Sequence, residues 1–108
     1  MIPIFTDPDT QKRPVRVLHL EDSAADHALV RLTLRRAGLP HEIRQVETLE
    51  EFTHWFGQQG YDLILADYRL PGFTALDAWH VVEKQLGHPP FVLLSGAIGE
   101  AAAVDAMR

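Results

Sequence analysis

The chain has 108 residues, of which 46% are apolar, and a formal net charge of −5. This length and composition suit one globular domain and argue against a disordered segment. The acidic balance argues against a nucleic-acid binder, which more often carries a basic face. The absence of cysteine excludes disulfides and thiolate metal sites. No apolar run reaches the roughly 20 residues that a membrane-spanning helix needs.

The first fourteen residues contain three prolines and lack the apolar stretch of a signal peptide. We therefore expect a flexible N-terminal extension over residues 1–14 and one domain over residues 15–108, ending within a fourth helix. The domain begins with Val15 to Leu20, a short apolar run rich in branched residues that predicts a buried strand.

A first helix is expected after this strand. Ser23 is a suitable N-cap, and Asp26 three residues later completes a capping-box pattern. Gly38 and Pro40 predict the end of the helix, because glycine favours the position after a C-terminus and proline cannot continue the helix. The stripe expected to be buried comprises four apolar residues: Ala28, Leu29, Leu32 and Ala37.

The middle of the chain repeats the alternation. Glu42 to Val46 predicts a second strand, and Thr48 with Glu51 predicts a second capping box, opening a helix that closes near Gly57 or Gly60. Asp62 to Ala66 contains a third apolar run and predicts a third strand. The apolar residues expected on the second helix are Leu49, Phe52 and Phe56.

A third helix is indicated by Thr74 and Asp77, again at capping-box spacing, and Gly87 predicts its end. Its expected apolar positions are Leu76, Trp79, Val82 and Leu86. Phe91 to Leu94 predicts a fourth strand, and Ala101 to Met107 the start of a fourth helix. Strands and helices thus alternate throughout, which predicts an α/β fold with an open parallel sheet and helices on both faces.

Acidic residues follow two of these strands. Ligands of open α/β sheets bind beyond the carboxyl ends of the strands, where Glu21, Asp22 and Asp67 stand, with Ser95 after the fourth strand. Neighbouring carboxylates repel each other, and a hard divalent cation such as Mg²⁺ would join them through oxygen ligands. A carboxylate beside the metal could also attack phosphorus and form an aspartyl phosphate.

Three segments resemble motifs of the response-regulator receiver domains of two-component signalling. Val17 to Ser23 resembles the acidic-pair motif that closes the first strand. Asp62 to Gly72 resembles the phosphoacceptor segment with its proline-glycine turn, and Phe91 to Gly96 the segment that ends in a hydroxyl residue. The motifs stand in the family's order, and the resemblance covers Val15 to Arg108. It implies a flavodoxin-like sheet of strand order 2-1-3-4.

The resemblance also implies a role for each site residue. Asp67 would accept a phosphoryl group from a sensor histidine kinase or phosphotransfer protein. Asp22, Asp67 and the backbone carbonyl of Arg69 would bind Mg²⁺, while Glu21 would act mainly through metal-bound water. Ser95 would hydrogen-bond the phosphoryl group and switch the conformation of the domain. The chain would thus be a cytoplasmic signalling protein that catalyses its own phosphorylation and dephosphorylation, without direct contact with nucleic acid or membrane.

The sequence departs from the family at its C-terminal end. The family has a fifth strand, ending in a lysine, and a fifth helix, whereas neither Lys12 nor Lys84 stands in a matching position. We expect the strand over Phe91 to Leu94 to present an open edge, which would favour self-association.

Two other functions remain open. An aspartate-dependent phosphohydrolase would also place a nucleophilic aspartate after a strand, but it needs a second acid where Arg69 stands. A pure interaction module would have the same fold without taking phosphate. A zinc site is not indicated, since the six histidines form no cluster, and His19 is interpreted as a packed core residue.

Overall fold

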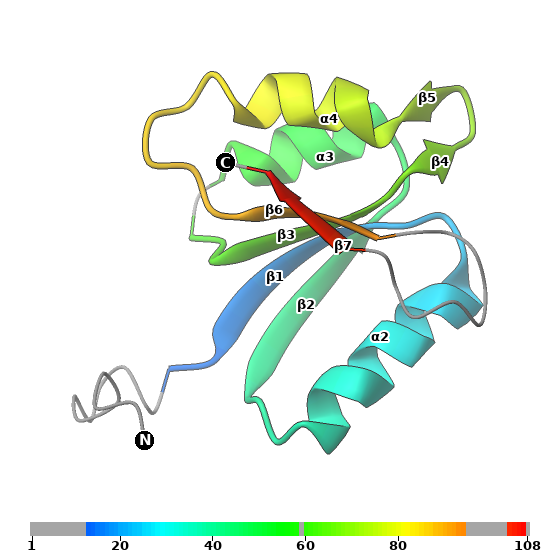
Figure 1. Cartoon of the computed structure of the whole chain (residues 1–108), viewed down its shortest axis with the longest axis vertical. Coiled ribbons are helices and arrows are strands. Elements are labelled where there is room, and N and C mark those ends of the chain that lie inside the picture. The colour runs from blue at the N-terminus through cyan, green and yellow to red at the C-terminus, as the bar shows by residue number, and fades with distance from the viewer. Residues whose placement is uncertain (1–12, 59, 95–103, 108) are drawn as a thin grey trace.

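A five-stranded sheet forms the centre of the computed structural model, which describes residues 13–58, 60–94 and 104–107. The strand order is β2-β1-β3-β6-β7, with β7 antiparallel to β6 and the other neighbours parallel (Figure 1). When only the parallel strands of this sheet are numbered, in chain order, their spatial order is therefore 2-1-3-4, as expected. Their bounds are β1 (Val15–Leu20), β2 (His41–Val46), β3 (Leu63–Asp67), β6 (Phe91–Leu94) and β7 (Val104–Met107).

Helices cover both faces of this sheet, which confirms the predicted flavodoxin-like class. Helix α2 (Ala24–Arg36) lies on one face, and α3 (Leu49–Phe56) and α4 (Ala75–Val82) lie together on the other (Figure 1). None of the helices in the described ranges has the length and apolar character needed to cross a lipid bilayer.

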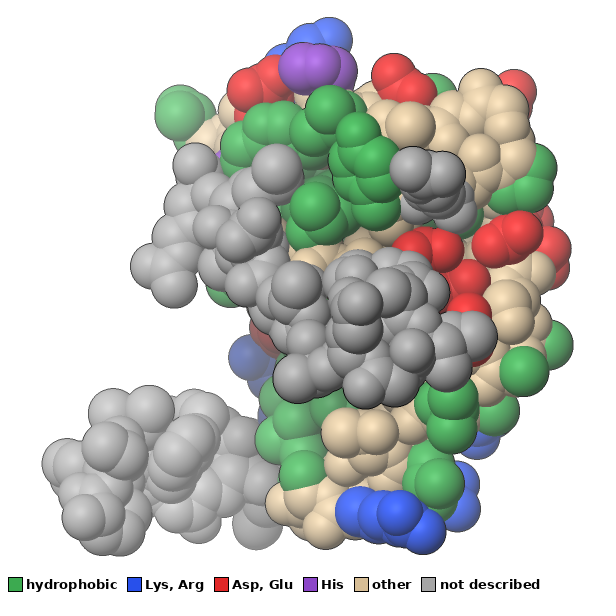
Figure 2. All heavy atoms as spheres, turned by 45° about the vertical axis from the view of Figure 1, so that its right-hand side comes forward, with side chains coloured by type: hydrophobic (Ala, Val, Ile, Leu, Met, Phe, Trp, Pro, Cys, Tyr) green, Lys and Arg blue, Asp and Glu red, His purple; other side chains and the backbone are tan. Residues whose placement is uncertain are grey.

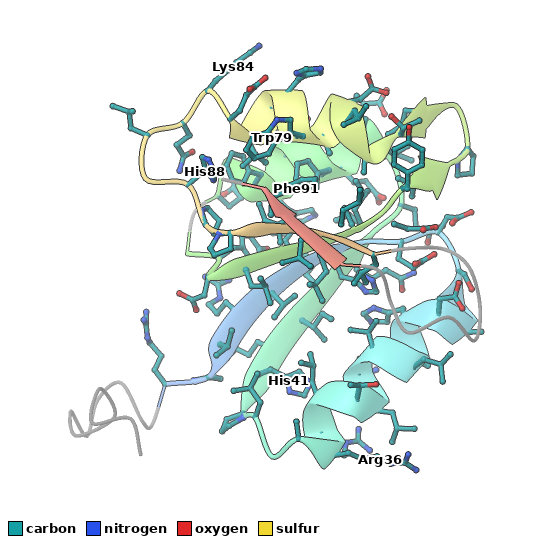
Figure 3. The ribbon with its side chains drawn as sticks, in the orientation of Figure 1. Arg36, His41, Trp79, Lys84, His88 and Phe91 are labelled. Atoms are coloured by element: carbon teal, nitrogen blue, oxygen red, sulfur yellow. The ribbon has the colours of Figure 1, made fainter. Side chains whose placement is uncertain are left out.

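The main core lies between the sheet and the pair α3 and α4. Alternate residues of β1 and β3 point to this side, because side chains alternate between the faces of a strand. Trp79 of α4 packs edge-on against Phe91 of β6 and against His88 (Figure 3). The buried cluster comprises Leu18, Leu20, Val46, Phe52, Phe56, Ile64, Ala66, Leu70, Ala75, Ala78, Val82 and Phe91.

Local capping signals set the starts of the helices. The predicted capping boxes at Thr48 with Glu51 and at Thr74 with Asp77 are both present. Ser23 also caps α2 as expected, since its side chain accepts from the Asp26 N–H. The reciprocal bond differs from the prediction, because the Ser23 N–H donates to the Glu21 carboxylate.

Two predicted apolar stripes are wrong in part. Helix α4 ends at Val82, so Leu86 is 98% exposed and does not continue the stripe. On α2, Leu29 is 58% exposed, and the described helix contains no fully buried residue. The half-buried positions of α2 include His27, Val30, Leu32 and Leu34, so of the predicted stripe only Leu32 is half-buried, while Ala28, Leu29 and Ala37 are exposed. The pattern did not count His27, which lies on the half-buried side, because histidine scores as polar in a periodicity pattern.

The helix predicted over Ala101 to Met107 is also wrong where the structure describes the chain. Val104–Met107 is the strand β7, antiparallel to β6. Unpaired backbone N–H and C=O groups along β6 favour a strand partner, which overrides the weak helical signal of four residues. The edge on which we based the expectation of self-association is therefore paired within the chain.

A small hairpin follows β3. Strands β4 (Arg69–Leu70) and β5 (Phe73–Thr74) pair antiparallel around Pro71 and Gly72. Gly72 has φ 84°, a conformation that glycine adopts without the strain of a side chain. The predicted proline-glycine loop is thus a tight two-residue turn.

Candidate functional site

Three carboxylates meet at the carboxyl end of the sheet. β1 pairs with β3 so that Leu20 lies beside Ala66, which brings the following residues together. One carboxylate oxygen each from Glu21, Asp22 and Asp67 lie within 4.8 Å of one another. Figure 2 shows acidic side chains gathered at mid-height on its right, the side toward which β1 and β3 end in Figure 1. The predicted convergence of these acids is therefore confirmed.

Hydrogen bonds from both sides hold the loop between β1 and α2. The Glu21 N–H donates to the Val46 carbonyl at 2.9 Å, and the Gln45 amide donates to the Glu21 carbonyl at 2.8 Å. The Glu21 carboxylate accepts from the Ser23 N–H at 3.1 Å. These bonds turn the Glu21 side chain back toward the loop and leave it only 5% exposed, whereas Asp22 is exposed.

The electrostatics of the cluster disfavour its fully ionised state. Burial is the largest cause that raises the pKa of Glu21 to about 7; the neighbouring carboxylates of Asp67, Asp26 and Asp22 contribute, and the Ser23 N–H opposes the rise. Burial also raises the pKa of Asp67, with Asp22 and Asp26 adding to the effect and the Tyr68 N–H opposing it. Crowded acids of this kind are stabilised by a cation.

The donor set fits Mg²⁺. All three side chains offer oxygen, the donor that this ion prefers, and Mg²⁺ commonly binds one or two carboxylates and completes its shell with water. The exposed Asp22 and half-buried Asp67 would be first ligands, and the buried Glu21 carboxylate, already engaged by Ser23, suits contact through water. The acids therefore form a candidate Mg²⁺ site.

The backbone of Arg69 is available for the same site. The Ala75 N–H donates to the Tyr68 carbonyl, which makes Arg69 and Thr74 the non-hydrogen-bonded pair of the hairpin. The Arg69 carbonyl therefore points away from β5. Ser95, the expected hydroxyl of the site, lies outside the described residues. Lys84 lies just beyond α4 and points outward, so it is not near the acids (Figure 3).

Sequence reasoning missed one contact beside this loop. His19 is fully buried, as predicted, but its Nδ1 lies 2.9 Å from Nδ1 of His27 on α2. The rings stack with centroids 5.1 Å apart. The available signal was two histidines spaced eight residues apart across a strand–helix junction. This spacing predicts a contact only once it is known which side of α2 faces the sheet.

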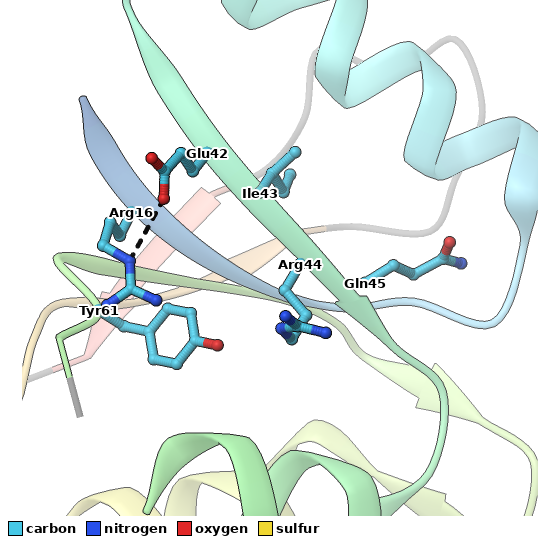
Figure 4. A pocket seen from close by; sticks show the side chains of 6 residues that line it. All are labelled: Arg16, Glu42, Ile43, Arg44, Gln45 and Tyr61. Carbon is cyan, nitrogen blue, oxygen red and sulfur yellow. Dashed lines mark ion pairs between the residues drawn. The ribbon is translucent and has the colours of Figure 1, made fainter. Parts of the chain in front are cut away.

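A pocket lies away from the acids, beside the edge strand β2. It has a volume of about 300 Å³ and includes Arg16, Arg44, Glu42 and Tyr61 in its walls (Figure 4). Arg16 pairs with Glu42 at 3.6 Å and lies over the Tyr61 ring, and Arg44 lies 3.6 Å over the Trp55 ring. Because these cations are already engaged within the chain, the pocket is a weaker candidate than the acidic cluster.

Comparisons with known proteins agree with this geometry. No family model matches the chain. The luminescence regulatory protein LuxO of Vibrio campbellii is 34% identical over 89 residues, covering 82% of this chain and 19% of LuxO. The chain thus spans about a fifth of the length of the curated relatives that it matches.

Solved structures share the fold. The phosphorylated cyanobacterial phytochrome response regulator RcpA is 27% identical, with TM-score 0.68, over 82% of this chain and 69% of RcpA. The response regulator TrrA of Thermotoga maritima, in complex with Mg²⁺ and BeF, is 26% identical, with TM-score 0.67, over 78% of this chain and 71% of the TrrA chain. TrrA has also been solved in complex with the histidine kinase ThkA.

Proposed function

Because this chain belongs to the receiver domains of response regulators, we propose that it takes a phosphoryl group onto Asp67 from a histidine kinase or phosphotransfer protein. The observation that carries the proposal is the convergence of Glu21, Asp22 and Asp67 within 4.8 Å. The domain would comprise residues 15–108, with residues 1–14 as an extension before it.

In this reaction an oxygen of Asp67 attacks phosphorus, the bond from phosphorus to the histidine nitrogen breaks, and an acyl phosphate forms. Bound Mg²⁺ would supply charge neutralisation for the phosphoryl oxygens and the clustered carboxylates. Asp22, Asp67 and the Arg69 carbonyl would hold the ion, and Glu21 would hold its water. Ser95 would donate a hydrogen bond to the phosphoryl group and relay the change to the surface.

Position explains why Asp67 and not another acid would be the acceptor. Asp67 ends the central strand β3 and is half-buried, whereas Asp22 is exposed and Glu21 is turned toward the Ser23 N–H. A nucleophile held on a rigid strand is easier to align with phosphorus than one in a loop. Phosphate on Asp67 would also adjoin the hairpin and the start of α4, so the signal would pass there.

The test is incubation with acetyl phosphate and Mg²⁺, followed by intact mass measurement. We expect a phosphate-sized mass gain in the wild-type chain that disappears without Mg²⁺ and in Asp67→Asn. Asp62→Asn is the matched control, since Asp62 precedes the same strand at its opposite end. Its carboxylate accepts from the Arg16 N–H, a bond that an amide oxygen can also accept, and pairs with the exposed Arg13 at 3.9 Å. No gain in the wild-type chain would contradict the proposal and favour an interaction module.

A further inference from the structure

Two histidines connect the elements on either side of the acidic loop. His19 on β1 is fully buried and His27 on α2 is half-buried, and their Nδ1 atoms lie 2.9 Å apart. A hydrogen bond between two Nδ1 atoms needs one donor and one acceptor, so the accepting ring must be neutral with its proton on Nε2. Burial lowers the pKa of His19 to about 4, and burial and Arg31 lower the pKa of His27. Both shifts favour the neutral rings.

The surroundings of His19 decide which ring donates. Its Nε2 is buried and has no hydrogen-bond partner among the described residues. A buried N–H without a partner is rarer in proteins than a buried acceptor without one. This favours a proton on Nδ1 of His19, which donates to Nδ1 of His27, and a proton on Nε2 of His27.

This bond closes a ring of contacts around the acidic loop. From β1 the ring runs through the Glu21 carboxylate to the Ser23 N–H. It continues from Ser23 into the first turn of α2, where Asp26 N–H donates to the Ser23 hydroxyl and His27 N–H to the Ser23 carbonyl. The imidazole pair joins the far side of that turn back to β1. The first turn of α2 cannot move away from the sheet without breaking the hydrogen bond between the two imidazoles.

We propose that His27 is a positioning residue for the acidic loop: its acceptor nitrogen holds the first turn of α2 against His19, and so fixes Glu21 and Asp22 relative to Asp67. The use of this geometry in Mg²⁺ binding rests on the proposed function. The hydrogen bond itself does not, and the two parts can be tested separately.

The experiment compares two substitutions at His27 in the full chain. Asn places its side-chain oxygen where Nδ1 stands and can still accept from His19, whereas Leu has similar bulk and no acceptor. His80→Leu is the matched control, since it removes an exposed histidine that bonds Glu83 on the opposite side of the sheet. Amide exchange by NMR, imidazole ¹⁵N shifts and calorimetric titration with Mg²⁺ alone are the measurements.

In His27→Leu we expect the Ser23 and Asp26 amides to exchange about threefold to tenfold faster, the effect of one lost hydrogen bond. The Mg²⁺ dissociation constant should rise by a similar factor. Both should return toward wild type in His27→Asn and stay unchanged in His80→Leu. The wild-type ¹⁵N shifts should show the Nδ1–H form for His19 and the Nε2–H form for His27.

Two results would overturn the inference. One is unchanged amide exchange in His27→Leu. The other is equally fast exchange in His27→Asn, which would mean that ring packing and not the hydrogen bond holds the turn. Failure of the wild-type chain to take phosphate, alongside the expected exchange pattern, would instead remove the proposed function and leave the positioning role of His27 supported.

Discussion

At the residue scale, Glu21 combines burial with the charge of three neighbouring carboxylates. It is only 5% exposed, and burial, followed by Asp67, Asp26 and Asp22, raises its pKa to about 7 from an ordinary 4.5. An acid whose pKa is higher in the folded than in the unfolded chain destabilises the fold as the pH rises, because the unfolded chain releases its proton first. This loss develops between about pH 4.5 and pH 7 and is complete above that window.

We therefore expect Glu21→Gln to stabilise the metal-free chain by about 1–3 kcal/mol near pH 8. Near pH 4 the carboxyl group is protonated in both states, so the difference should largely disappear. Glutamine can still accept from the Ser23 N–H, which preserves the loop. Urea unfolding at both pH values, without divalent cations, measures the change.

Glu50→Gln, on the exposed side of α3, is the matched control and should change the free energy of unfolding by less than about 0.5 kcal/mol. Added Mg²⁺ should stabilise the wild-type chain more than Glu21→Gln, because the cation offsets repulsion that the variant lacks. An equal gain in both would contradict the view that Glu21 contributes its charge to the site.

The hairpin of β4 and β5 is the informative feature at the scale of single elements. Its two-residue turn makes Arg69 the non-hydrogen-bonded position and directs the Arg69 carbonyl away from β5. Gly72 makes the turn possible, with φ 84°. Among the residues that the structure describes, beyond its chain neighbours, none has a heavy atom within 4 Å of an added Cβ there, so a substitution would disturb mainly the backbone conformation.

Replacing Gly72 with Ala should destabilise the chain by about 1–2 kcal/mol, the cost of a left-handed conformation for a residue with a side chain. Gly57→Ala provides the comparison, because Gly57 has φ −66° and an added Cβ would meet its neighbours at ordinary contact distance. That variant should be neutral or slightly stabilising. Thermal melts of both variants separate the two cases, and equal shifts would contradict the strain argument.

Sequence predicted the starts of elements better than their ends and faces. The capping boxes at Thr48 and Thr74 depend only on residues three positions apart, so they could be predicted from the sequence. The end of α4 at Val82 and the strand β7 depend on packing and on an unpaired sheet edge, which local patterns do not encode. The same division holds at the site. The convergence of the acids could be predicted from their position after the strands. The contact of His19 with His27 could not, because it depends on which side of α2 faces the sheet.

At the scale of the whole molecule, the core of the described residues lies mainly on one side of the sheet, although Val17 and His19 are fully buried on the other side. Its buried cluster lies between the sheet and the helices α3 and α4, and α2 on the other face leaves Leu29 58% exposed. Phe52 sits at the centre of that cluster, fully buried and stacked on Phe56. The stability of the domain therefore depends mainly on one face of the sheet.

Phe52→Ala should cost about 3–5 kcal/mol, the usual range for removing a buried aromatic side chain. That is a large share of the roughly 5–15 kcal/mol by which a domain of this size is stable. Leu29→Ala, on the opposite face, should cost less than about 1 kcal/mol. Urea unfolding of the two variants under the same conditions tests this asymmetry, and comparable losses would show that α2 carries more of the core than its exposure indicates.

The pairing of β1 with β3 has a consequence for folding kinetics. Partners on these strands are 46 residues apart, as the bond from the Arg16 N–H to Asp62 shows. A contact so distant in sequence forms only after a long loop has closed, which makes parallel sheets slow to assemble. Glu21 and Asp67 meet only when that pairing is complete. During refolding, affinity for Mg²⁺ should therefore arise with the centre of the sheet and not with the earlier helices. The onset of Mg²⁺ binding would then report when the slow pairing step is complete.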